Sequence, residues 1–170
     1  RYVCDSGIGT SLVDPGGDNT LILPAGGSGT LTGSVTFGPG ADRVEMASGI
    51  ITGVLDQGAG IDTFIMTGGQ LQALQQGNGR DLFQMSGGRI IGAFEDGDVA
   101  YMSGGRIVGA FEDGDVARMS GGRIGRVLNL GFGQDLVLAG HVFVEELAQF
   151  AFGHSAHEAI DRLPVFEQNA

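Results

Sequence analysis

Short stretches in which apolar and polar residues alternate recur along this chain at intervals of 17 to 20 residues. In the stretch from Asp62 to Met66, the second and fourth residues after the aspartate lie on one face of a β-strand, because side chains alternate across a strand. These two positions are apolar in each repeat: Val44 and Met46, Phe64 and Met66, Phe83 and Met85, Ala100 and Met102, Ala117 and Met119. The positions between them are mixed, so the first set is predicted to form the core and the second mostly surface.

A second apolar column follows a glycine-rich segment in each repeat. Its members are Leu31, Ile51, Leu71, Ile90, Ile107 and Ile124. Phe83 gives way to Ala100 where the repeat shortens to 17 residues, as expected if the coil narrows there. Phe94 and Phe111 are then expected to stack in a second strand, at the level of Leu55 and Val35.

Apolar repeats of about 20 residues with glycine turns are the signature of a solenoid. We therefore expect an all-β protein, a parallel β-helix of about six coils, in which each strand pairs with its equivalent about 4.8 Å away. Residues 86–100 and 103–117 differ at one of 15 positions, which indicates a duplicated coil. The predicted organisation is an irregular segment at 1–19, the solenoid at 20–140, and a capping segment at 141–170 with short helices at 145–152 and 155–163.

The composition supports a regularly turning β structure. Glycine accounts for 33 of 170 residues, and 42 % of the residues are hydrophobic and fall in register. Glycine pairs at the corners supply the positive φ that other residues adopt only with strain. With 20 acidic and 9 basic residues the net charge is −11, which argues against nucleic acid or an anionic membrane as a partner. This charge suits a soluble, extracellular or calcium-rich setting.

The cysteine content, the length of the apolar runs and the first residue bear on cross-linking, membrane insertion and processing. Cys4 is the one cysteine, so an intramolecular disulfide is excluded. We expect a partly buried thiol there, with a cross-link to another chain as the alternative. No apolar run is long enough to cross a membrane, so no membrane insertion of this segment is expected. The chain opens at Arg1 without an initiator methionine, which is typical of a mature or trimmed fragment.

A ladder of aspartates accompanies the repeat, one in each coil. Four of them lie in a Gly-x-Gly-x-Asp frame, as in the segment from Gly58 to Asp62. This frame resembles the calcium-binding nonapeptide of RTX β-rolls, and stacked carboxylates with corner carbonyls are ligands that calcium prefers. The resemblance covers the corners of Asp42, Asp62, Asp81 and Asp135 and implies a calcium edge there. The crowded corners of the shortened repeats extend this predicted calcium edge to Asp96, Asp98, Asp113 and Asp115. The alternative is that each aspartate accepts hydrogen bonds from the backbone amides of its own turn.

Two neighbouring corners, Glu95–Asp98 and Glu112–Asp115, place six carboxylates close together. They form either a local cation site or a solvated acidic corner, which would be partly neutralised by arginines nearby. The candidates are the column of Arg89, Arg106 and Arg123, and Arg118. The stacked arginines could themselves hold a sulfated or carboxylated glycan.

Two histidines near the end of the sequence give a weaker metal-binding pattern. His154 and His157 with Glu158 have a spacing that suits a metal pair, but no third strong ligand is near in the sequence, and residues of a capping helix are the alternative. No catalytic residues are predicted, because a residue copied into every coil serves the architecture. We therefore expect no enzymatic activity.

One coil, Gly79–Gly92, has the form Gly-x-Asp-x-φ-x-Met-Ser-Gly-Gly-x-Ile-x-Gly. Coils of this form resemble those in the passenger domains of bacterial autotransporters, proteins of type V secretion. The segment Asn19–Pro24 with the lone Cys4 upstream is also similar to that family. The resemblance implies a right-handed parallel β-helix that is exported across the outer membrane and is secreted or displayed on the bacterial surface.

The sequence therefore leads to three functional hypotheses. The first is a non-enzymatic passenger segment that serves as a stalk or as an adhesion surface. Its partner would be a protein or glycan on a host or neighbouring cell, or another copy of the chain. The second is an RTX-like secreted module that binds calcium, the one cofactor considered. The third is a glycan-processing β-helix enzyme.

Overall fold

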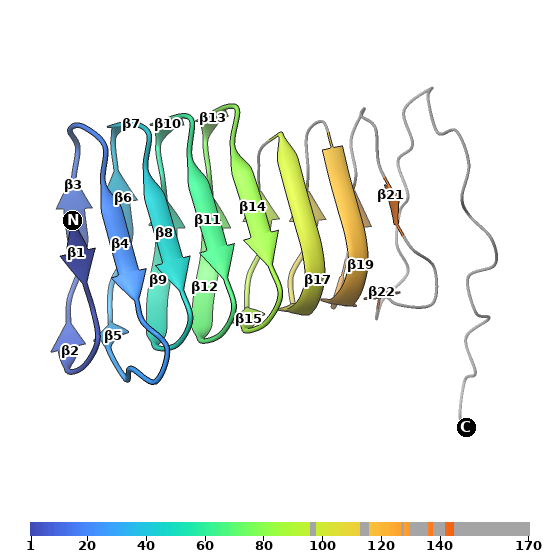
Figure 1. Ribbon diagram of the computed structural model, residues 1–170, viewed down its shortest axis with the longest axis horizontal. Coiled ribbons are helices and arrows are strands. Elements are labelled where there is room, and N and C mark those ends of the chain that lie inside the picture. Colours follow the sequence, from blue (N-terminus) through green and yellow to red (C-terminus); the bar gives the residue numbers. More distant parts are fainter. Residues whose placement is uncertain (96–97, 113–115, 127, 130–135, 138–141, 145–170) are drawn as a thin grey trace.

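The computed structural model describes residues 1–95, 98–112, 116–126, 128–129, 136–137 and 142–144. It confirms an all-β parallel solenoid of about six turns, and no helix occurs among these residues (Figure 1). The described part of the chain accordingly contains no helix that is long and apolar enough to cross a membrane.

Three columns of parallel strands run along the solenoid. The first contains β1 (Tyr2–Val3), β4 (Thr20–Leu23), β8 (Arg43–Met46), β11 (Thr63–Met66), β14 (Leu82–Met85), β17 (Val99–Ile107), β19 (Val116–Ile124) and β21 (Leu136–Val137). The second contains β2 (Ile8–Gly9), β5 (Thr30–Leu31), β9 (Ile50–Asp56), β12 (Gln70–Gln75), β15 (Arg89–Ile90), the ends of β17 and β19, and β22 (Val142–Val144).

The third column closes each coil. It contains β3 (Leu12–Asp14), β6 (Val35–Phe37), the ends of β9 and β12, β16 (Phe94–Glu95), β18 (Phe111–Glu112) and β20 (Leu128–Asn129). A separate three-stranded sheet forms at the corner before the first column, from β7 (Pro39–Gly40), β10 (Ala59–Gly60) and β13 (Asn78–Gly79). Every pairing is parallel, so each residue faces its equivalent one coil along.

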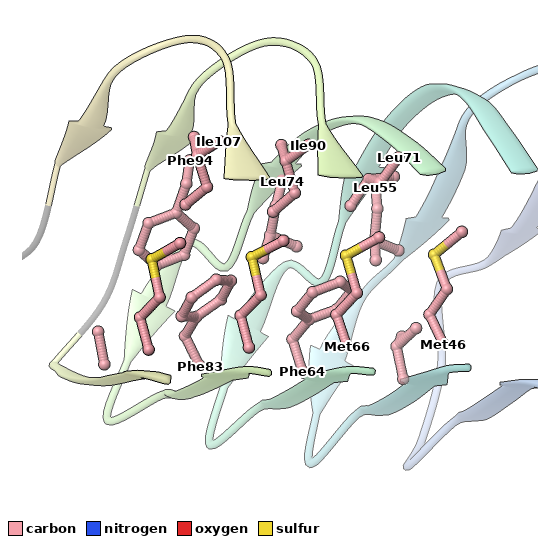
Figure 2. Packing of buried hydrophobic residues seen from close by; sticks show 14 of the residues in the cluster. Met46, Leu55, Phe64, Met66, Leu71, Leu74, Phe83, Ile90, Phe94 and Ile107 are labelled. Carbon is pink, nitrogen blue, oxygen red and sulfur yellow. The ribbon is translucent and has the colours of Figure 1, made fainter. Parts of the chain in front are cut away.

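The core lies between the columns, and the predicted inward positions fill it. Figure 2 shows Phe64, Phe83 and the methionines on the first column pointing toward leucines and isoleucines on the others. Met46, Met66 and Met85 are in register, and each is at most 1 % exposed. Burying such a side chain contributes about 1.5–3 kcal/mol relative to leaving it exposed. The repeated coil therefore derives its stability from identical contacts made many times.

The aromatic residues change strands where the coil shortens. Phe64 and Phe83 stack with ring centroids 5.8 Å apart, and the next residue in that column is Ala100. Phe94, on β16 across the coil, brings its ring to 4.1 Å from Phe83, and Phe111 follows at 4.8 Å from Phe94. The rings thus form one continuous row of contacts, stacked at Phe64 and Phe83 and tilted at Phe94 and Phe111, which we call the aromatic stack. The shorter coil is filled from the opposite strand.

The structure extends the solenoid beyond the predicted boundary at its start. Residues 2–14, expected to be irregular, contain β1, β2 and β3, which pair in parallel with the next coil. The coil that follows is longer than the period, so the repeat was hidden in the sequence. Near the other end, Val142–Val144 forms a strand beside β19, and the helices predicted at 145–152 and 155–163 lie outside the described residues.

Replacing Phe94 by alanine should remove the ring that links the two parts of the aromatic stack. We expect the free energy of unfolding, measured by chemical denaturation, to fall by about 3–5 kcal/mol because a buried ring is replaced by a cavity. The matched control is Ile61→Ala, since Ile61 is 67 % exposed and its truncation should change stability by less than about 0.5 kcal/mol. Equal losses in the two variants would contradict the continuous stack.

Candidate functional site

Three aspartates of the predicted calcium edge turn inward. Asp42, Asp62 and Asp81 each precede a strand of the first column, and they are only 1 %, 0 % and 1 % exposed. The register of the strands places the three residues directly above one another. A buried carboxylate is costly unless its oxygens are hydrogen-bonded, so the partners of these side chains decide their role.

Each carboxylate accepts a hydrogen bond from the preceding coil. Oδ1 of Asp62 accepts from the backbone N–H of Asp42 at 2.8 Å, and Oδ1 of Asp81 accepts from the N–H of Asp62 at 2.8 Å. Oδ1 of Asp42 likewise accepts from the N–H of Asn19 at 2.6 Å. We call this row from Asn19 to Asp81 the aspartate ladder. The alternative to a calcium edge was that each aspartate accepts from the amides of its own turn; in the structure the donor amide belongs instead to the preceding coil.

The second oxygen of each carboxylate has no hydrogen-bond partner among the described residues. Oδ2 of Asp42, Asp62 and Asp81 is buried without a hydrogen bond. Burial raises the pKa of all three groups, against the lowering effect of the amide hydrogen bond that each accepts. For Asp62 the neighbouring carboxylates of Asp81 and Asp42 add to the effect of burial, and its pKa is raised to about 7. The buried carboxyl group of Asp62 is therefore about half protonated near neutral pH.

Two glutamines line the same corner from within. The Nε2 group of Gln57 donates to the backbone oxygens of Asp42 at 3.3 Å and Thr63 at 3.2 Å. Gln76 takes the same place one coil along: its Nε2 donates to the carbonyl of Leu82 at 3.3 Å, the equivalent of Thr63, and to Oε1 of Gln57 at 3.2 Å instead of a second carbonyl. Both glutamines are completely buried. The corner is thus held together by side-chain bonds inside the coil as well as by the strands outside it.

Glycine allows these corners to stack closely. Gly60 has a φ of 151°, and a Cβ on it would collide with the carbonyl oxygen of Gly40 in the preceding coil. Gly79 stands in the same relation to the carbonyl of Gly60. The Gly-x-Gly-x-Asp frame therefore has a structural reason in this protein: the glycines admit the backbone of the next coil, and the aspartate bonds to it.

Of the other aspartates of the predicted calcium edge, the structure describes only Asp98. Asp98 is half-buried, and among the described residues its side chain makes no bond to the amide of Asp81, so the aspartate ladder stops where the coil shortens. Asp96, Asp113, Asp115 and Asp135 lie outside the described residues, as do His154, His157 and Glu158. In the described part of the chain no three histidine, cysteine, aspartate or glutamate side chains converge on one metal position. The calcium edge stays a prediction.

The arginines lie in two places. Arg89, Arg106 and Arg123 are in register on neighbouring coils, as the sequence indicated. Arg118 is separate from them: its guanidinium lies 6.0 Å from the ring centre of Tyr101, at the limit of a cation–π contact.

Tyr101 and Arg118 belong to an exposed groove of about 430 Å³ on the outer face of the first column. The groove is built from one triplet repeated on four coils: an outward residue, a methionine and a hydroxyl residue. The outward residues are Ile65, Gln84, Tyr101 and Arg118, and the hydroxyl residues are Thr67, Ser86, Ser103 and Ser120. On the coil before them the corresponding residues are Glu45 and Ala47, and Glu45 forms a salt bridge with Arg43 at 2.7 Å.

Comparison with known proteins adds no relative. No protein-family model matches the chain, and neither a curated protein nor a solved structure is significantly similar to it.

Sequence reasoning missed several polar residues of the corner. Asn19 takes the first place in the aspartate ladder, but it is not an aspartate and it lies 23 residues before Asp42 instead of 20. Gln57 and Gln76 stand five residues before Asp62 and Asp81 and directly before a glycine, a coincidence of spacing that could have identified them. The groove gave no signal, because its outward residues differ from coil to coil.

Replacing Asp62 by asparagine should flatten the dependence of stability on pH. Because the pKa of Asp62 is raised, the native state binds its proton more tightly than the unfolded state does. The resulting stability is full below about pH 4, the usual carboxyl range, and is lost as the pH rises to about 7, above which it no longer changes. Asparagine keeps an oxygen acceptor for the amide of Asp42 and cannot ionise.

The measurement is the free energy of unfolding between pH 4 and pH 8, approximately the range that Asp62 spans. Asp62→Asn should lose much of the fall seen in the unmodified chain and be the more stable of the two at the alkaline end. Glu45→Gln, which removes an exposed carboxylate from the same sheet, should keep the original slope. An unchanged slope in Asp62→Asn would refute the interior position of this proton.

Proposed function

We propose that this chain is a non-enzymatic β-solenoid segment of an exported bacterial protein, which acts as a stalk and carries an interaction surface. The resemblance of its coils to autotransporter passengers supports the export and the position at the cell surface or outside it. The acidic net charge of −11 agrees with a soluble protein in such a setting.

The observation that carries the proposal is the contrast between the two sides of the first column. Inward positions are apolar in every coil, with methionine at one of them from Met46 to Met119, and they form one buried cluster from Leu21 to Ile124. The outward position between them changes in each coil, from Glu45 through Ile65, Gln84 and Tyr101 to Arg118. A constant frame with a variable outer face is what a scaffold that presents recognition residues requires, since only the inner positions are constrained by packing.

The stalk function is supported by the way the coils contact one another. Each coil contacts its two neighbours through the same strand pairings, so both the stability and the length of the solenoid increase with the number of coils. The buried position of Asp42, Asp62 and Asp81 favours a structural role for the aspartates over the RTX-like calcium alternative.

Deleting residues 99–115 should shorten the stalk without unfolding it. The deletion joins Asp98 to Val116, and Val116 is preceded by an aspartate in the natural chain as well, so the local sequence at the junction is preserved. We expect the maximum dimension from small-angle X-ray scattering to fall by about 4.8 Å, one coil spacing, with an unchanged β-type circular dichroism spectrum.

Scattering recorded with calcium and with a chelator should coincide for both chains, because the stacking contacts are internal. An unfolded deletion variant would contradict the independence of the coils on which a stalk relies. A chain that becomes compact only when calcium is added would favour the RTX-like alternative.

A further inference from the structure

The groove on the outer face combines features that are absent from the neighbouring coil. Its four triplets run along the solenoid axis over β11, β14, β17 and β19. With a coil spacing of about 4.8 Å, the outward residues from Ile65 to Arg118 span about 14 Å, enough for a few units of a linear polymer. At the β8 coil the triplet becomes Glu45, Met46 and Ala47, which replaces the hydroxyl and introduces a paired carboxylate. One end of the groove therefore lies between β8 and β11.

Among the described residues that line the groove, Arg118 is the one charged residue and none is a carboxylate. Within the described part of the chain the Arg118 guanidinium has no acidic partner, and its contact is with the ring of Tyr101. Stacking on the ring leaves the edge of the guanidinium available, with N–H donors in the geometry that matches a carboxylate. Tyr101 is 37 % exposed, so the pair lies open to solvent.

The hydroxyl residues form the second recognition element. Thr67, Ser86, Ser103 and Ser120 are exposed and line one side of the groove. None of their hydroxyls makes a hydrogen bond with another described residue. A hydroxyl both donates and accepts, so a column with one hydroxyl in each coil can pair with a ligand that carries hydroxyls at regular intervals. Sugars have that property.

An extended peptide is a poorer fit to this face. Peptides that add to a sheet bind the unpaired backbone of an edge strand. Here β11 pairs with both β8 and β14, and β14 pairs with both β11 and β17. β17 likewise pairs with β19 on its other side. The groove thus offers side chains only, which suits a ligand recognised through hydroxyls and one anionic group.

We propose that this groove binds a linear glycan lying along the solenoid axis, with a sugar carboxylate on Arg118 and sugar hydroxyls on the Ser/Thr column. The net charge of −11 repels a densely charged polymer, whereas a glycan with isolated carboxylates is repelled less and still pairs with Arg118. The assignment rests on the proposed function, since it names the partner class of the interaction surface.

The test is isothermal titration calorimetry with hyaluronan oligosaccharides, in which a carboxylated sugar alternates with an uncharged one. The control ligand is the same oligosaccharide with its carboxylates reduced to alcohols. We expect the reduced form to bind about 10-fold more weakly, as the loss of one charge-assisted hydrogen bond implies. Arg118→Gln should weaken binding of the intact ligand by about the same factor, and Tyr101→Ala by about five-fold.

The matched control variant is Arg43→Gln, which removes an exposed arginine from the same strand column outside the groove and should change affinity by less than about two-fold. Circular dichroism and thermal unfolding should be unchanged in all three variants, because the three side chains are exposed. Absence of hyaluronan binding, or equal affinity in Arg118→Gln, would overturn the proposal. Tighter binding of polyglutamate would overturn it in favour of an acidic protein partner.

The same samples separate this inference from the proposed function. If the oligosaccharide is cleaved during the titration, as its length by mass spectrometry would reveal, the non-enzymatic function fails while the groove remains its binding site. If no glycan binds and the coil-deletion variant still shortens the folded rod, the stalk stands and the glycan assignment fails.

Discussion

Strict register between successive coils is the constraint on which this structure depends. Every strand pairs in parallel with its equivalent, so a residue meets the same position of the next coil about 4.8 Å away. The register determines which residue types are acceptable at each point. Methionine and phenylalanine can stack on copies of themselves, and glycine must stand where the backbones approach most closely, as at Gly60. A like-charged column is tolerated only where solvent or a hydrogen bond compensates for the repulsion.

The aspartate ladder meets this constraint in an unusual way. An aspartate on a solenoid corner would ordinarily face solvent, but here the carboxylate turns inward and bonds to the amide of the preceding coil. The amide needs this partner because it lies just before the strand begins, where the neighbouring backbone no longer supplies a carbonyl. Burial of the second oxygen of each carboxylate costs free energy, and this cost is smaller when the carboxyl group is protonated. The stability of the corner therefore depends on pH.

The repeat made the fold predictable from the sequence, whereas the features that deviate from the repeat were not predicted. The core columns followed from alternation, because inward positions such as Phe64 and Met66 must be apolar in every coil. Residues 2–14 were missed because the coil after them is longer, which removes the period. The direction of the Asp62 side chain could not be inferred, since a corner aspartate has amides available both in its own turn and in the coil before. The groove depends on residues that differ between coils, and a pattern search discards such positions.

The interior hydrogen bond of Asp62 is also what separates a structural ladder from a row of exposed metal ligands. Nuclear magnetic resonance can follow the carboxyl carbon of Asp62 and the amide proton of Asp42 in one pH titration. We expect both signals to titrate together with a midpoint near 7 and calcium not to shift them. A midpoint near the usual carboxyl value of about 4, with no response from the Asp42 amide, would contradict this expectation.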